Sequence, residues 1–137
     1  MVQSAIKGLG EVNVRVKDLA TMTKFYVDVL GLKPIYKSKK HVFLRVADGF
    51  GGHTQVVALF NHEYDGHRNA PDAGKSTLHH VAFEIPLKSL AVERRRLEDA
   101  GLEISEEEHP EVHWRSIYFD DPEGNQIEFV SYDKTLT

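Results

Sequence analysis

The stretch Glu11-Val-Asn-Val-Arg-Val16 has a counterpart in His80-Val-Ala-Phe-Glu-Ile85, and these two stretches decide the fold. A shift of 69 residues aligns their apolar positions. The strict alternation of apolar and polar side chains predicts a strand with one buried face in each. A helical run follows each strand and ends at a glycine, Gly31 in the first copy and Gly101 in the second, because glycine commonly terminates helices. The chain therefore contains two copies of one unit, which predicts a pseudo-symmetric domain with its site between the halves.

Each copy is predicted to contain a strand, a helix and three further strands. In the first copy Asp18 is placed to cap the helix. The further strands of the first copy are expected at residues 34–36, 41–46 and 55–60. The second copy is expected to have a strand over 78–85, a helix over 88–100, a short strand over 102–104, and strands over 114–119 and 126–130. The fold class is thus α+β, with two βαβββ modules whose sheets are mixed and strongly curved.

The acidic run Glu106-Glu107-Glu108 lies between two of these strands. A run of like charges without apolar neighbours is typical of a solvated surface, so we interpret it as an acidic loop. His109 follows directly and is expected to belong to the same loop.

A chain of 137 residues is expected to form a single domain with an ordinary core. Module one spans about residues 7–62 and module two about 78–132. The connector, residues 63–77, is polar and rich in turn-forming residues, which favours a linker over a lid.

Charge and composition exclude several classes of partner. The net charge of −4 gives no basis for binding nucleic acid or an anionic membrane. The absence of cysteine excludes disulfides and thiolate chemistry and fits a reducing cytoplasm. The first residues lack the apolar core of a signal peptide, and no run has membrane-spanning length.

The order of several short motifs resembles one superfamily over nearly the whole chain. The motifs are Val14-x-Val16-x-Asp18-Leu19 with Phe25-Tyr26-x-x-Val29-Leu30-Gly31-Leu32, then His79-His80-Val-Ala-Phe83, and Asp121-Pro-Glu-Gly-Asn125-x-Ile-Glu128. In this order and on matching halves they resemble the vicinal oxygen chelate superfamily. That superfamily includes glyoxalase I, extradiol dioxygenases, fosfomycin-resistance transferases, methylmalonyl-CoA epimerase and bleomycin-binding proteins. The resemblance supports the fold more strongly than any one reaction, because a fold hosts many chemistries.

The resemblance implies that the curved, mixed sheets of the two βαβββ modules form a cup. It also implies two metal positions in each unit that face this cup, which fall here on Glu11, Ala58, His80 and Glu128. Ala58 has no ligand atom, so the implied site is Glu11, His80 and Glu128 with open positions for substrate or water. Glu11 departs from the commoner histidine. Two carboxylates and one imidazole favour manganese, zinc, nickel, cobalt or magnesium, without excluding iron.

His80 and Glu128 also have interpretations that do not involve a metal. A histidine within an apolar strand is often a hydrogen-bonded core residue, which applies to His80. A buried carboxylate needs a partner, and for Glu128 an arginine would serve as well as a metal. In that case the cup binds a small molecule without metal, as bleomycin-resistance proteins do.

His109, Tyr118 and Glu128 have the spacing of a motif that the resemblance links to ring cleavage. In extradiol dioxygenases a histidine and a tyrosine in this pattern help to bind or deprotonate the catechol. The resemblance therefore implies that Tyr118 and His109 are catalytic, although Glu107 breaks the formal signature. Three further residues near the expected site have open roles: His53, His113 and Arg115.

The leading interpretation is a metalloenzyme in which one divalent ion chelates adjacent oxygens of a small metabolite. The His109 and Tyr118 spacing favours a ring-cleaving dioxygenase, whereas the harder ligands favour a lyase or isomerase, and both stay open. The expected partners are a small-molecule substrate and a second copy in a homodimer, with module exchange between subunits left open.

Overall fold

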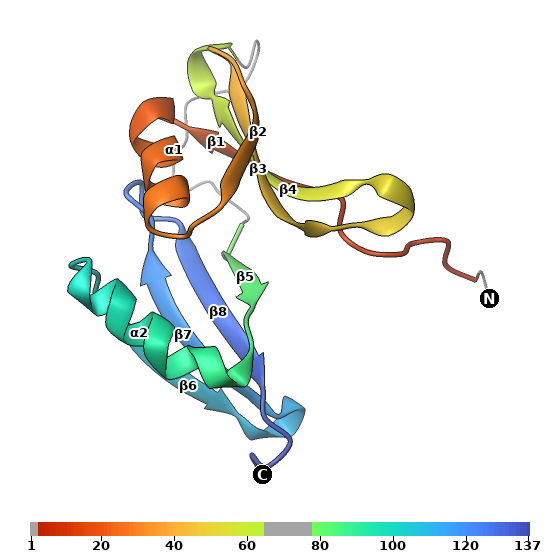
Figure 1. Ribbon diagram of the computed structural model, residues 1–137, viewed down its shortest axis with the longest axis vertical. Coiled ribbons are helices and arrows are strands. Elements are labelled where there is room, and N and C mark those ends of the chain that lie inside the picture. Colours follow the sequence, from red (N-terminus) through yellow and green to blue (C-terminus); the bar gives the residue numbers. More distant parts are fainter. Residues whose placement is uncertain (1–2, 65–77) are drawn as a thin grey trace. The chain divides into compact units, whose positions relative to one another are not determined.

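The protein, a computed structural model in which residues 3–64 and 78–137 are described, has two units with the same order of elements (Figure 1). The units span Met1–Pro71 and Asp72–Thr137. Most of the predicted connector, from residue 65 onward, lies outside the described residues. Within the described ranges, no helix combines the length and hydropathy needed to cross a membrane.

The first unit follows the predicted strand, helix and three strands. Its elements are β1 (Glu11–Val16), α1 (Leu19–Asp28), β2 (Lys33–Lys37), β3 (His41–Asp48) and β4 (Thr54–Asn61). The sheet has the order β1-β4-β3-β2, in which β1 and β4 are parallel and the other pairs antiparallel. Asp18 caps α1 as predicted, because its Oδ1 accepts from the backbone N–H of Thr21 at 3.0 Å.

The two faces of the first sheet differ as the alternation in β1 predicts. Val14 and Val16 are buried, and Met22 and Tyr26 are the buried side chains of α1, which packs against β3 and β4. Glu11 is exposed on the opposite face of β1. Burial of the valine face thus leaves the other face for polar chemistry.

The second unit repeats this arrangement. Its elements are β5 (His80–Glu84), α2 (Leu90–Asp99), β6 (Ser105–His109), β7 (Trp114–Asp120) and β8 (Gln126–Tyr132). The sheet order β5-β8-β7-β6 is that of the first unit, with β5 and β8 parallel. Leu97 of α2 is fully buried. The helices are followed in the two units by Gly31 (φ 76°) and Gly101 (φ 89°), in the left-handed conformation that glycine adopts without strain.

Two predictions for the second unit were wrong. Residues 102–104 are not a strand, and the acidic run is not a loop, because β6 is Ser105–His109 and pairs antiparallel with β7. The sequence of this strand has no apolar alternation because it is an edge strand, and charged edges are common since they oppose pairing with another chain. Two acidic side chains also have cationic partners: Arg94 pairs with Glu106 and Arg115 with Glu108.

The turn between β7 and β8 sets the register of the hairpin on which the site is built. Asp121 is buried, and its Oδ1 accepts from the backbone N–H groups of Glu123 at 2.9 Å and Asn125 at 3.0 Å. Its Oδ2 accepts from the side-chain amide of Asn125 at 2.8 Å. With the turn held in this way, Tyr118 of β7 lies directly opposite Glu128 of β8.

Candidate functional site

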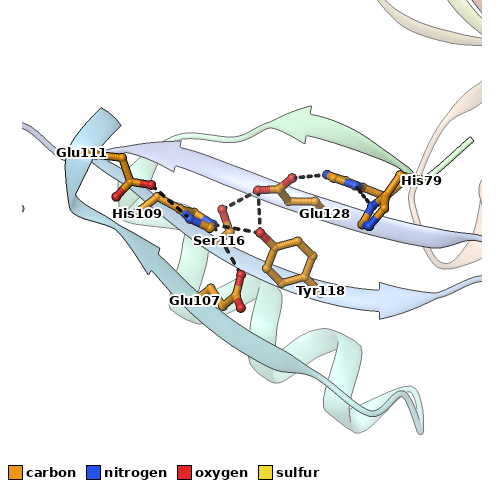
Figure 2. Close-up of polar contacts among 8 residues, drawn as sticks. His79, Glu107, His109, Glu111, Ser116, Tyr118 and Glu128 are labelled. Carbon is orange, nitrogen blue, oxygen red and sulfur yellow. Dashed lines mark hydrogen bonds and ion pairs between the residues drawn. The ribbon is translucent and has the colours of Figure 1, made fainter.

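Glu128 is a buried carboxylate at the centre of a polar network on one face of the second sheet (Figure 2). Its Oε1 accepts from the hydroxyl of Ser116 at 2.5 Å and from that of Tyr118 at 3.2 Å. Its Oε2 lies 2.9 Å from Nε2 of His80. With 5% of its surface exposed, the carboxylate depends on these donors in place of water.

Strand pairing brings these side chains together from three segments of the chain. Tyr118 is the register partner of Glu128, and Ser116 lies two residues earlier on the same face of β7. His80 is at the start of β5, which runs parallel to β8 on its other side. Glu128 therefore has hydroxyl donors on one neighbouring strand and an imidazole on the other.

The hydrogen bonds determine where the imidazole protons lie. An ionised carboxylate only accepts, so Nε2 of His80 donates to Glu128. Nδ1 of His80 lies 2.7 Å from Nδ1 of His79. In the tautomer that carries its one proton on Nε2, Nδ1 of His80 accepts from Nδ1–H of His79.

Tyr118 links Glu128 to His109, as Figure 2 shows. Its hydroxyl donates to Glu128, and Nε2 of His109 lies 3.0 Å from the same oxygen. Burial raises the pKa of the Tyr118 hydroxyl. A side-chain hydrogen bond with Ser116 lowers this pKa, and the negative charge of Glu128 raises it. The hydroxyl therefore keeps its proton at neutral pH.

His109 extends the network to the exposed edge of the sheet. Nε2 is 3.6 Å from a carboxylate oxygen of Glu107, and Nδ1 is 3.9 Å from one of Glu111. His109 is the last residue of β6, so the strand pairing of β6 and not a loop positions its ring. The residues of the spacing motif, His109, Tyr118 and Glu128, are thus brought together.

The equivalent positions of the first unit are Glu11 and Ala58. Asn13 of β1 pairs with Ala58 just as Ala82 of β5 pairs with Glu128. Glu11 and His80 accordingly hold the same place in the two copies. Glu11 is exposed and accepts from the side-chain amide of Asn13 at 3.2 Å, whereas Ala58 is fully buried.

The pair of His80 and Glu128 fits two ligands of one divalent ion. Imidazole nitrogen and carboxylate oxygen each bind such ions at about 2.1 Å, so two ligands at a right angle lie about 3 Å apart. Nε2 and Oε2 are 2.9 Å apart. Among the described residues, no group of three or more His, Cys, Asp or Glu side chains is arranged to hold a metal ion, so the pair has no third ligand of these types from its own unit.

The three residues whose roles the sequence left open have structural partners. Nε2 of His53 lies 3.0 Å from the carbonyl oxygen of Gly10. Nδ1 of His113 lies 2.6 Å from that of Leu136. Arg115 donates to Asp133 at 2.6 Å and holds the pKa of that carboxyl at about 2.

Sequence reasoning assigned no role to Ser116 or His79, although both belong to the network. The signal for Ser116 is a hydroxyl two residues before Tyr118, on the same face of a predicted strand by alternation. His79 precedes the alternating part of its strand, so no pattern indicates where its ring points.

The network lies within a region that matches a known family. A sequence model described as the Glyoxalase/Bleomycin resistance protein/Dioxygenase superfamily matches residues 8–129. The chain belongs to this superfamily. The expected fold is therefore confirmed by the family and by the paired βαβββ units.

Members of the superfamily that are similar to this chain have different chemistries. Metallothiol transferase FosB of Bacillus licheniformis is 26% identical over 129 residues, which cover 93% of this chain and 77% of FosB. Biphenyl-2,3-diol 1,2-dioxygenase 3 of Rhodococcus globerulus is 32% identical over 120 residues, which cover 84% of this chain and 58% of the dioxygenase. The chain thus spans little more than half the length of the dioxygenase.

A similar solved structure within the superfamily contains a metal ion. It is a variant of the fosfomycin resistance protein FosX of Listeria monocytogenes, in complex with Mn(II) and 1S,2S-dihydroxypropylphosphonic acid. Its TM-score is 0.69 at 23% identity, with 96% of this chain and 94% of FosX covered. At 23% identity this similarity supports the fold alone.

Proposed function

We propose that this protein is a metal-dependent enzyme that acts on a small metabolite through two adjacent oxygen atoms. The observation that supports it most is the pair of His80 and Glu128, whose ligand atoms lie 2.9 Å apart, with the carboxylate buried and the imidazole partly exposed. The proposed ligands of one divalent ion, among Mn, Zn, Ni, Co, Mg and Fe, are Glu11, His80 and Glu128. A bound ion of this kind supplies Lewis-acid stabilisation of negative charge on substrate oxygen.

Glu11 is proposed as the third ligand because it holds in β1 the place that His80 holds in β5. It is exposed, and among the described residues its carboxylate accepts a hydrogen bond from the neutral side-chain amide of Asn13 at 3.2 Å. A carboxylate held by one neutral donor is readily released to a cation.

Tyr118 and His109 are proposed to act as general acid and base beside the substrate. The hydroxyl of Tyr118 carries a proton and lies between the carboxylate of Glu128 and the imidazole of His109. A proton at this oxygen can be exchanged with Nε2 of His109, which is the geometry required of a general acid and base. His109 is partly exposed and can pass the proton on to water.

Two reaction types fit this arrangement. Ring cleavage by a dioxygenase is supported by the His109 and Tyr118 geometry and by the similarity to a biphenyl-diol dioxygenase. Lyase or isomerase chemistry is supported by the carboxylate-rich ligand set, which suits ions other than iron.

The second candidate is a metal-free binding protein similar to bleomycin-resistance proteins. Ala58 supplies no ligand at the place where Glu128 lies in the other copy. The carboxylate of Glu128 is also satisfied by Ser116, Tyr118 and His80 without a metal. Such a protein would use the polar face to orient a ligand.

Removal and return of metal separate these candidates. The protein is treated with a chelator, each ion is added back, and the melting temperature and bound-metal stoichiometry are measured. Ion at about 100 times its dissociation constant stabilises the folded state by about 2.7 kcal/mol. This stabilisation should vanish in His80→Ala and Glu128→Ala and weaken in Glu11→Gln, whereas the exposed control Glu103→Gln should behave as wild type.

If no ion is retained and none shifts the melting temperature, the metalloenzyme proposal is rejected and the metal-free binding protein is favoured. If metal binds, oxygen consumption with a panel of catechols distinguishes the reactions. Metal-dependent consumption supports the dioxygenase, and its absence favours a lyase or isomerase.

We also propose that the protein is a cytoplasmic homodimer, which its superfamily membership and cysteine-free sequence support. Sedimentation equilibrium at micromolar concentration tests the assembly, and a mass of one chain, 15.5 kDa, would exclude it.

A further inference from the structure

We propose that Ser116 is a positioning residue that fixes the carboxylate of Glu128, so that Oε2 is the oxygen available beside His80. This inference rests on the proposed function, since it assigns to Ser116 control of the affinity for the metal ion.

The hydrogen bond from Ser116 is the shortest of those that Glu128 accepts among the described residues. Oγ and Oε1 are 2.5 Å apart, within the range of about 2.5–2.7 Å for a hydroxyl that donates to a charged oxygen. Ser116 is 2% exposed, so water does not replace this donor. The side chain is short and comes from a central strand, which leaves it little freedom to move.

The donors divide unequally between the two carboxylate oxygens. Oε1 accepts from both Ser116 and Tyr118, whereas Oε2 contacts His80. An oxygen that already accepts two hydroxyl protons has little capacity left for a cation. The hydroxyl of Ser116 therefore selects Oε2 as the ligand atom and holds it on the side of the imidazole.

Ser116 is better suited to this role than Tyr118. The hydroxyl of Tyr118 lies farther from Oε1, at 3.2 Å, and also contacts His109. Its one oxygen is therefore shared between positioning Glu128 and exchanging protons. The buried hydroxyl of Ser116 has Glu128 as its acceptor, and a buried hydroxyl without an acceptor is costly.

Ser131 provides a matched control. It is also buried in the same sheet, in β8, but its hydroxyl donates to the carbonyl oxygen of Ile85 at 3.0 Å. Each Ser→Ala substitution removes one buried hydroxyl group, so the two variants lose the same small volume from the interior. Only Ser116→Ala should alter the orientation of Glu128.

The test measures the dissociation constant for Mn²⁺ by titration calorimetry in wild type and three variants. Ser116→Ala should weaken binding about 10- to 100-fold, the usual effect of removing a group that orients a ligand. Ser116→Thr keeps the hydroxyl and should stay within about threefold, and Ser131→Ala should match wild type. Equal affinity of Ser116→Ala and wild type would overturn the positioning role while the metalloenzyme stands.

A second measurement on chelator-treated protein does not depend on metal. Correlation spectra of the ¹⁵N-labelled histidine rings should show His80 as the Nε2–H tautomer in wild type and a mixture in Ser116→Ala, because Oε2 is no longer held as acceptor. If the wild-type protein binds no ion, the metalloenzyme proposal is rejected, and the histidine spectrum alone tests the positioning role of Ser116. An unchanged tautomer in Ser116→Ala would then overturn the inference.

Discussion

The free energy of unfolding of the metal-free protein should fall more in Ser116→Ala than in Tyr118→Phe. Both substitutions delete a hydroxyl that donates to the same oxygen of Glu128. A hydrogen bond to a charged group contributes about 1.5–3 kcal/mol. The two bonds differ in length and in access to water, so their losses should differ as well.

Ser116→Ala should cost about 2–3 kcal/mol. The lost bond is 2.5 Å long and the site is 2% exposed, so Oε1 gains no water in return. Tyr118→Phe should cost about 1 kcal/mol, because its bond of 3.2 Å is longer than the optimum and Ser116 still donates to Oε1. His109 remains partly exposed and finds water.

Urea unfolding in the presence of chelator tests this order. The one tryptophan of the chain, Trp114, lies in β7 beside these residues, so its fluorescence reports on the second unit. With a slope of about 1–3 kcal/mol per M, a loss of 2 kcal/mol moves the midpoint by roughly 1 M. Tyr132→Phe, at an exposed position of β8, is the control and should stay within about 0.5 kcal/mol of wild type. An equal or larger loss in Tyr118→Phe would refute the reasoning.

Two further predictions concern the loss of stability at low pH and the turn between β7 and β8. Asp133 has a pKa lowered to about 2 from 3.8, chiefly by the hydrogen bond from Arg115, so its stabilising effect is present above pH 4 and is lost as the pH falls towards 2. Carboxyl NMR should show this pKa rising towards 3.8 in Arg115→Met, and an unchanged pKa would contradict the assignment. Asp121→Ala should lower the free energy of unfolding by about 2 kcal/mol, because the backbone N–H groups of Glu123 and Asn125 and the side-chain amide of Asn125 lose their acceptor. Asp121→Asn retains an accepting oxygen and should lose about half as much in urea unfolding.

Strands with one buried face were predictable because the pattern in each is local. Glu11-Val-Asn-Val-Arg-Val16 alternates, and β1 has those bounds. The cap at Asp18 and the end of the helix before Gly31 were predictable for the same reason, since each depends on a few neighbouring residues.

The edge strand β6 was not predictable from apolar periodicity. Its residues Ser105–His109 include three glutamates and no apolar side chain. Pairing with β7 and the contacts of Arg94 and Arg115 with its carboxylates account for its conformation. These partners lie elsewhere in the sequence, so no local rule finds them.

The sequence by itself determined the duplicated βαβββ order and the buried position of Glu128, because alternation and helix termination act over a few residues. Only the tertiary structure decided which groups surround that carboxylate. The register of β7 and β8 brings Ser116 and Tyr118 to one oxygen, and β5 brings His80 to the other. Strand pairing depends on contacts between distant segments, and a shift of one residue would turn each of these side chains to the opposite face.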